Sequence, residues 1–187
     1  MIPDVLEHRL AEHCAPTLLG AKAASLLSLS REEFPELPEA LRRYNRTLYR
    51  TGLRFLILRE TSQRSLILVF RPALLRSRLN TAGAKALLQR FDYPETDCLG
   101  VLLRRLKKRF TPGGDFPHEI GLFLDYPPED VEAFIAGSSE CKLCGYWKVY
   151  GGVDGARERF ACYDACRLCL CRMLAAGNTI SQLLQTA

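Results

Sequence analysis

The sequence predicts an α+β fold in which a small mixed or antiparallel sheet is covered by helices. Two nearly continuous apolar runs, 53–58 and 65–70, are joined by the polar segment 59–64, which is the pattern of a central β-hairpin. Because both runs are apolar over most of their length, we expect helices on both faces of the sheet. Segments with helical periodicity flank the hairpin on both sides, and the one nearest the C-terminus is rich in cysteine.

The chain before the hairpin begins with a predicted helix at 3–13. We expect residues 14–20 to be extended or turn-like, because the residue before Pro16 disfavours the α region. Residues 21–29 fit either a strand or a short helix. These assignments place Cys14 at the boundary between two elements.

Five further segments have apolar residues spaced as on one face of a helix, and several carry basic residues on the other faces. The net charge of +5 arises from 26 basic and 21 acidic residues, a modest excess that fits an ordinary solvated surface. The densest basic run, 104–109, has only Phe110 as an aromatic neighbour in the sequence, so nucleic acid is not an expected partner. The five predicted helices are 36–50, 72–79, 81–90, 95–110 and 127–135.

With 187 residues and 48% hydrophobic composition, the chain can bury one substantial core, so we predict a single domain over 1–187. The Gly-Ser-Ser stretch at 137–139 marks 138–187 as an alternative Cys-rich C-terminal subdomain. No run of about eighteen apolar residues is present, so we expect no membrane partner and a cytoplasmic location. Thiols stay reduced in the cytoplasm, and the eight cysteines therefore indicate metal binding, reactivity or burial rather than disulfides.

Six of the eight cysteines lie between Cys141 and Cys171. Cys141 and Cys144 form one C-x2-C pair, and Cys166 and Cys169 form a second pair after 21 intervening residues. Two such turns supply four thiolates, which is the ligand set of a structural Zn²⁺ site or of an iron-sulfur cluster. The sequence therefore favours a protein that binds Zn²⁺ or an Fe-S cluster through these four residues.

Two other interpretations of the same region stay open. On a predicted helix at 153–176, Cys162, Cys166, Cys169 and Met173 recur at steps of four, three and four, as in a buried apolar stripe that needs no metal. The third interpretation is redox chemistry of the thiols with a redox partner.

A different hypothesis is an enzyme that acts on a small molecule. Cys14, at its predicted element boundary, is a candidate thiolate nucleophile. His118 and Glu119 follow a Gly/Pro-rich loop and are candidates for a catalytic base or a metal ligand. The candidate ligand-binding run, which is aromatic and basic, is Tyr146, Trp147 and Lys148.

A module that binds nucleic acid or an acidic partner is the remaining hypothesis. It rests on the arginine-rich helices, because the guanidinium group suits bidentate contacts with phosphate or carboxylate. It requires these arginines to converge on one face of the molecule.

Three motifs are spread along the chain, namely HCAPTL at 13–18, HEIGLFLxYP at 118–127 and CKxCGxWKVYG at 141–151. In this order they resemble an uncharacterised family, a domain of unknown function from anaerobic gut Firmicutes. The resemblance covers nearly the whole chain. It implies a bacterial cytosolic protein and brings no established activity.

Overall fold

The computed structural model describes residues 5–111 and 113–185, so the predicted start of the first helix at residue 3 lies outside the described residues. The described chain divides into two compact units. Unit 1 consists of the described residues up to Pro72 and from Tyr163 onward, and unit 2 consists of Ala73–Cys162. The predicted α+β class is confirmed, since helices accompany a three-stranded and a two-stranded antiparallel sheet.

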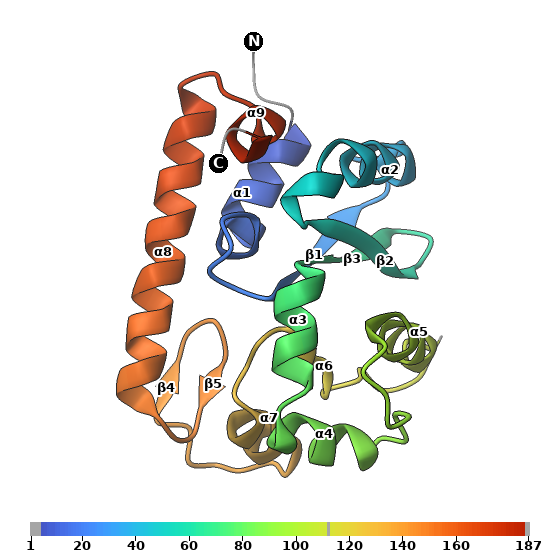
Figure 1. The fold of residues 1–187 in the computed structure, drawn as a ribbon, viewed down its shortest axis with the longest axis vertical. Helices are drawn as coiled ribbons and strands as arrows, with labels where there is room; N and C mark the ends of the chain where they lie inside the picture. The colour runs from blue at the N-terminus through green and yellow to red at the C-terminus, as the bar shows by residue number, and fades with distance from the viewer. Residues whose placement is uncertain (1–4, 112, 186–187) are drawn as a thin grey trace. The chain divides into compact units, whose positions relative to one another are not determined.

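The sheet of unit 1 has the strand order β1-β3-β2 with antiparallel pairing (Figure 1). Strand β1 is Ala24–Ser30, β2 is Arg54–Glu60 and β3 is Arg64–Phe70. The predicted hairpin is confirmed as β2 and β3, and the ambiguous segment after the first helix forms strand β1. In the central strand, Ile67 pairs with Leu27 of β1, and both side chains are buried.

Helices cover this sheet and complete the core of unit 1. Helix α1, Val5–Leu18, packs against β1 and β3, and α2, Leu37–Thr47, packs against β2. A 3-10 turn, Tyr49–Thr51, follows α2, and α9 is Ile180–Gln185. The core side chains come from both ends of the chain and include Leu10, Cys14, Leu18, Leu41, Leu48, Leu53, Ile67, Leu170, Leu174 and Ile180.

A buried carboxylate in α1 joins the two ends of the chain within unit 1. Glu7 is only 5% exposed. Its Oε1 accepts a hydrogen bond from the Tyr44 hydroxyl at 3.2 Å, and its Oε2 accepts one from the backbone N–H of Ile180 at 3.2 Å. The start of α9 is therefore held by a side chain from the first helix.

Helix α1 continues to Leu18, so the prediction that it ends near Cys14 is wrong. Pro16 lies inside the helix, and its carbonyl oxygen accepts hydrogen bonds from the backbone N–H groups of Ala21 at 2.8 Å and Lys22 at 3.1 Å. The last turn of the helix is buried in the core. Burial of its apolar side chains outweighs the local preference of a residue that precedes proline.

Within its described residues, unit 2 contains five helices and the first part of a sixth, α8. The predicted helix at 72–79 is confirmed with the same bounds, and the one predicted at 127–135 is observed at 128–135. Thr81 accepts a hydrogen bond from the backbone N–H of Ala84 and caps the next helix, as Thr commonly does. The helices are α3, Pro72–Leu79; α4, Ala82–Gln89; α5, Leu99–Arg109; α6, Ile120–Phe123; and α7, Pro128–Ile135 (Figure 1).

A small hairpin and a long helix follow α7. Strands β4, Leu143–Cys144, and β5, Lys148–Val149, form the two-stranded sheet. Helix α8, Val153–Ala175, begins in unit 2 and ends in unit 1, which confirms the predicted C-terminal helix. Within the described residues, no helix combines the length and the apolar character needed to cross a membrane.

Candidate functional site

The two predicted C-x2-C pairs belong to different units. Cys141 and Cys144 lie exposed at the β4 strand of unit 2, where the Cys141 thiol donates a hydrogen bond to the carbonyl oxygen of Leu143 at 3.3 Å. Cys166 is half-buried and Cys169 is exposed, both in the part of α8 that belongs to unit 1. Among the described residues, no group of three or more His, Cys, Asp or Glu side chains is placed to hold a metal ion. The four-cysteine site stays a prediction.

The buried face of α8 does not coincide with the predicted stripe of cysteines and methionine. Cys162 and Cys169 are exposed, and Met173 is 41% exposed. Cys166 packs against the core of unit 1, so one member of the stripe faces inward. The fully or nearly buried side chains of α8 are instead Ala156, Tyr163, Leu170 and Leu174.

Cys14 lies in the core of unit 1 and is completely buried. Burial raises the pKa of its thiol to about 12, although the positive charge of Lys22 opposes this shift. Near neutral pH the group is therefore a protonated thiol, whereas nucleophilic attack requires the thiolate. This environment gives no support to the candidate role of Cys14 in catalysis.

His118 and Glu119 are neighbours in sequence, but their side chains have different surroundings. His118 is exposed and contacts the rings of Phe116 and Phe134, whereas Glu119 is completely buried. The Glu119 carboxylate accepts hydrogen bonds from the Tyr93 hydroxyl at 3.1 Å and from Nε of Arg109 at 2.6 Å. Burial, with the negative charge of Glu119, raises the pKa of Tyr93. Glu119 therefore lies in a satisfied buried network rather than beside His118.

The link between α6 and α7 places a carboxylate in an uncommon backbone conformation. Helix α6 ends in a Schellman motif, in which the N–H of Tyr126 donates to the carbonyl of Gly121 at 3.0 Å and the N–H of Asp125 donates to the carbonyl of Leu122 at 3.2 Å. Asp125 has a φ of 64°, at the position that is usually glycine in this motif. The side chain of Asp125 is thereby held in place, only 5% exposed.

Two guanidinium groups share the Asp125 carboxylate. Nε of Arg78, in the last turn of α3, lies 2.9 Å from Oδ1 of Asp125. A terminal nitrogen of Arg159, in the first part of α8, lies 3.5 Å from Oδ2 and also donates to the backbone carbonyl of Asp125 at 2.5 Å. The two arginines, from distant parts of the sequence, therefore converge on one buried acid.

The guanidinium group of Arg159 packs against a buried indole. Trp147 is 6% exposed, and the guanidinium of Arg159 lies 4.8 Å from the centre of its ring. The indole stacks on Tyr126 with ring centres 5.2 Å apart and donates its N–H to Oδ2 of Asp130 at 2.8 Å. Oδ1 of Asp130 accepts the backbone N–H groups of residues 150 and 151 at 2.8 and 3.2 Å. The second and third family-like motifs therefore meet within unit 2.

Two glycines are required where these segments pack closely. A Cβ atom on Gly121 would lie 2.8 Å from a methyl group of Val131, and one on Gly145 would overlap the ring of Phe160. Phe160 contacts Trp147 edge to face with ring centres 4.5 Å apart. Both glycines belong to the family-like motifs, so part of each motif serves packing around the indole.

These groups border a pocket that we call the arginine pocket. Its volume is about 350 Å³, within the range of small-molecule sites. Its lining combines apolar side chains with the guanidinium groups and the buried carboxylate. The pocket is lined by Arg78, Thr81, Ala84, Leu122, Asp125, Tyr126, Pro127, Pro128, Glu129 and Arg159.

Of the predicted ligand-binding residues, only Trp147 is close to this pocket, behind Arg159. Tyr146 contacts Phe160, and the ammonium group of Lys148 lies 5.6 Å from the centre of the Phe134 ring. Sequence analysis did not identify the residues that define the pocket, namely Arg78, Asp125 and Arg159.

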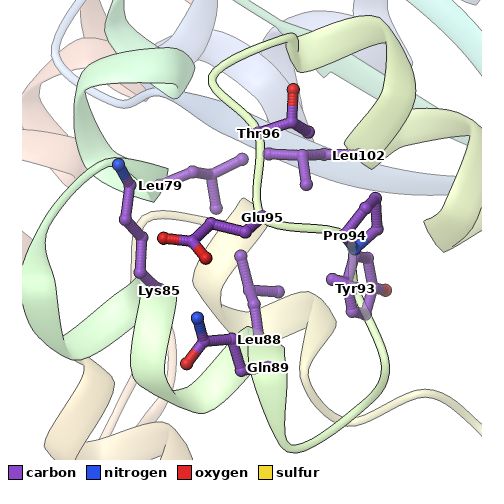
Figure 2. Close-up of a pocket in the computed structure, with 9 residues that line it drawn as sticks. All are labelled: Leu79, Lys85, Leu88, Gln89, Tyr93, Pro94, Glu95, Thr96 and Leu102. Atoms are coloured by element: carbon purple, nitrogen blue, oxygen red, sulfur yellow. The ribbon is translucent and has the colours of Figure 1, made fainter.

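Two other hollows are less suited to a ligand. The one in Figure 2, between α4 and the segment from Tyr93 to Thr96, has a volume of about 20 Å³, which is room for little more than a water molecule. A polar hollow of about 240 Å³ in unit 1 is bordered by His13, Arg9 and Arg64. A terminal nitrogen of Arg9 lies 3.6 Å from a carboxylate oxygen of Glu33, and Nε of Arg64 donates a hydrogen bond to the Ser28 hydroxyl. Both arginines therefore already have partners within the protein.

Comparison with known proteins identifies a family for this chain. No curated protein and no solved structure matches it. A family model described as a protein of unknown function, DUF3793, matches residues 10–184, which is nearly the whole chain and includes the arginine pocket. The chain therefore belongs to the DUF3793 family of proteins of unknown function.

Proposed function

We propose that the protein binds a small organic anion, a carboxylate or a phosphate ester, in the arginine pocket. The observation that carries this proposal is the shared carboxylate of Asp125, which holds Arg78 and Arg159 at the border of a hollow of about 350 Å³. Guanidinium groups match carboxylate and phosphate oxygens in a planar, bidentate geometry.

Arg78 keeps hydrogen-bond donors that a ligand can use. Arg78 uses its Nε atom for Asp125, and its side chain is 53% exposed. Within the described residues, the two terminal nitrogens of Arg78 have no hydrogen-bond acceptor. A planar anion in the pocket can therefore accept two parallel hydrogen bonds from this residue.

The backbone at Asp125 also favours a binding role over simple packing. Asp in the left-handed region costs on the order of 1 kcal/mol more than glycine would at the same position. Such local cost is typical of positions that hold functional groups. Here it places a carboxylate between two arginines, so that the pocket is formed before a ligand arrives.

The ligand class follows from the composition of the lining. Pro127, Pro128 and Leu122 add apolar side chains to the charged groups, which suits a ligand with a carbon skeleton rather than a bare inorganic ion. The exposed Glu129 at the border disfavours ligands of very high negative charge.

The indole of Trp147 provides the assay, because it is the only tryptophan in the chain and lies under Arg159. The full chain is titrated with inorganic phosphate, with dicarboxylates such as succinate, and with phosphate monoesters such as glycerol phosphate. We expect a saturable change in tryptophan emission with an organic anion, and a weaker response to inorganic phosphate.

Matched variants of α3 test the site. Arg78→Ala removes charge-assisted hydrogen bonds and should weaken binding at least about tenfold. Arg76→Ala removes an exposed arginine from the same helix and should leave the affinity unchanged. Equal losses in the two variants, or no response to any of the three probe classes at millimolar concentration, would show that the pocket is not an anion site.

A second candidate function is binding of Zn²⁺ or an Fe-S cluster, or redox chemistry, through the C-terminal cysteines. It is supported by the exposure of Cys141, Cys144 and Cys169, which leaves their thiols accessible to a metal or an oxidant. Elemental analysis of the protein tests it directly.

A further inference from the structure

Exposed aromatic rings form a surface patch on unit 2 that is separate from the lining of the arginine pocket. Phe116 is 44% exposed and Phe134 is 39% exposed, and within the described part of unit 2 they are the only exposed large hydrophobic side chains. The His118 ring lies between them, with ring centres 5.8 Å from Phe116 and 5.1 Å from Phe134. We call Phe116, His118 and Phe134 the aromatic patch.

The aromatic patch continues directly from the end of α5. Phe110 follows the last residue of that helix, and its ring contacts the ring of Phe116 with centres 5.5 Å apart. At the other end of the patch, the ammonium group of Lys148 lies 5.6 Å from the centre of the Phe134 ring. Cationic groups are therefore present at both ends.

The basic residues of α5 divide into an inner and an outer set. Arg105 and Arg109 each have a carboxylate within 4.0 Å. The outer set is exposed, and no carboxylate among the described residues lies within 4.0 Å of it: Arg104, Lys107 and Lys108. The negative end of the helix dipole favours cations here, but it does not account for aromatic rings beside them.

We propose that the aromatic patch and the outer cations of α5 bind single-stranded nucleic acid. Unstacked bases pack on exposed aromatic faces, and phosphates pair with Lys and Arg. The His118 ring is tilted by 51° to the Phe116 ring and by 74° to the Phe134 ring, so His118 does not stack flat on either phenylalanine. A duplex, whose bases are already stacked, cannot use these rings. Within the described part of unit 2 no large aliphatic side chain is exposed, which argues against an apolar protein partner.

The test is fluorescence anisotropy of the full chain with labelled oligo(dT) and oligo(U) of about 20 nucleotides, which exceeds the usual site size. We expect saturable binding to at least one of them, and the oligonucleotide with the higher affinity shows whether the natural ligand is DNA or RNA. If all three outer cations contact phosphates, the logarithm of the affinity should fall with the logarithm of the salt concentration at a slope of about −2.

Two double variants separate stacking from charge. Phe116→Ala with Phe134→Ala should weaken binding at least about fivefold and leave the salt slope unchanged. Lys107→Gln with Lys108→Gln should flatten the slope by about 1.4. All four side chains are exposed, so these variants are not expected to disturb folding, and circular dichroism checks this.

Matched controls come from unit 1. Arg43→Gln with Arg46→Gln removes two exposed arginines from α2, and Tyr49→Ala removes an aromatic side chain that is 65% exposed. We expect wild-type binding from both. Arg78→Ala should also bind normally, which separates this surface from the anion site.

Three results would overturn the proposal. The first is equal binding of duplex and single strand, because this would indicate general attraction to phosphates. The second is unchanged affinity when both phenylalanines are replaced. The third is competition by polyglutamate as effective as by oligonucleotide, which would assign the surface to acidic peptides.

Discussion

Replacement of Asp125 tests whether its backbone conformation is maintained for the sake of its carboxylate. Asp125→Gly removes both the left-handed strain and the ion pairs, whereas Asp125→Asn removes the charge and keeps a side chain at a φ of 64°. If the carboxylate serves mainly to place the two arginines, the glycine variant should be the more stable of the two.

The magnitudes follow from the exposure of the arginines. A nonglycine residue in the left-handed region costs on the order of 1 kcal/mol, and only Asp125→Gly recovers this. Loss of a partner from a fully buried ion pair costs about 3–5 kcal/mol, but Arg78 is 53% exposed and Arg159 is 33% exposed. Water can hydrate both, so we expect about 1–2 kcal/mol for the lost carboxylate. Asp125→Asn should therefore lower the free energy of unfolding by about 1–2 kcal/mol, and Asp125→Gly by about 0–1 kcal/mol.

Urea denaturation of the two variants and the wild type, followed by tryptophan emission, measures this difference. The emission of Trp147 reports the region around Arg159 directly. A glycine variant less stable than the asparagine variant would refute the reasoning, because it would mean that the Asp125 side chain itself stabilises the turn.

Three further predictions concern the thiols and the glycine next to the indole. The thiol of Cys14 has a pKa of about 12 in the folded protein against 9.0 as an ordinary thiol, so its contribution to the free energy of unfolding is complete below pH 9.0 and is lost as the pH rises toward 12. Cys14→Ala should reduce the decline of stability in this range, and an unchanged decline in urea titrations at several pH values would contradict the assignment. Gly145→Ala should destabilise the protein by about 1–3 kcal/mol, because the added methyl group overlaps the ring of Phe160. Gly155→Ala, where the added methyl group meets no neighbour on α8, should instead stabilise it by about 0.5–1 kcal/mol. Similar urea midpoints for the two variants would disprove the packing argument. Protein purified without oxygen should contain about one equivalent of zinc, or iron with sulfide absorption, if the four-cysteine site forms, and metal-free protein would contradict a site at Cys141, Cys144, Cys166 and Cys169.

The secondary structure was predictable where one local signal dominated. The hairpin of β2 and β3 has two apolar runs and a polar turn, and α7 begins with a proline and two acids, so short-range chemistry decides both. The end of α1 was not predictable in this way. The local signal at Pro16 favours a turn, while the end of the helix contacts residues farther along the sequence. Thr17 hydrogen-bonds to Ser25 of β1, and Arg71 donates to the carbonyls of Thr17 and Leu18.

The candidate site depends on contacts that no local pattern in the sequence predicts. Arg78 and Arg159 are two among many arginines, and nothing near either one indicates a shared partner. Asp125 is the one residue that the motif HEIGLFLxYP does not specify, and its importance comes from a left-handed φ that is usually adopted by glycine. The tryptophan was recognisable as a candidate because aromatic residues clustered beside a C-x2-C pair, but its role behind Arg159 required the fold.

The composition of unit 1 from both ends of the chain has a consequence for biosynthesis. During translation, all of unit 2 leaves the ribosome before Tyr163 and the residues after it, so unit 2 can fold while unit 1 still lacks Leu170, Leu174 and the start of α9. Until then the acid at position 7 has its Tyr44 partner but not its partner at Ile180. Unit 1 is therefore completed late, by contacts between two segments that are separated in the sequence by the whole of unit 2. Long-range contacts of this kind form slowly, which makes this the step most exposed to misfolding.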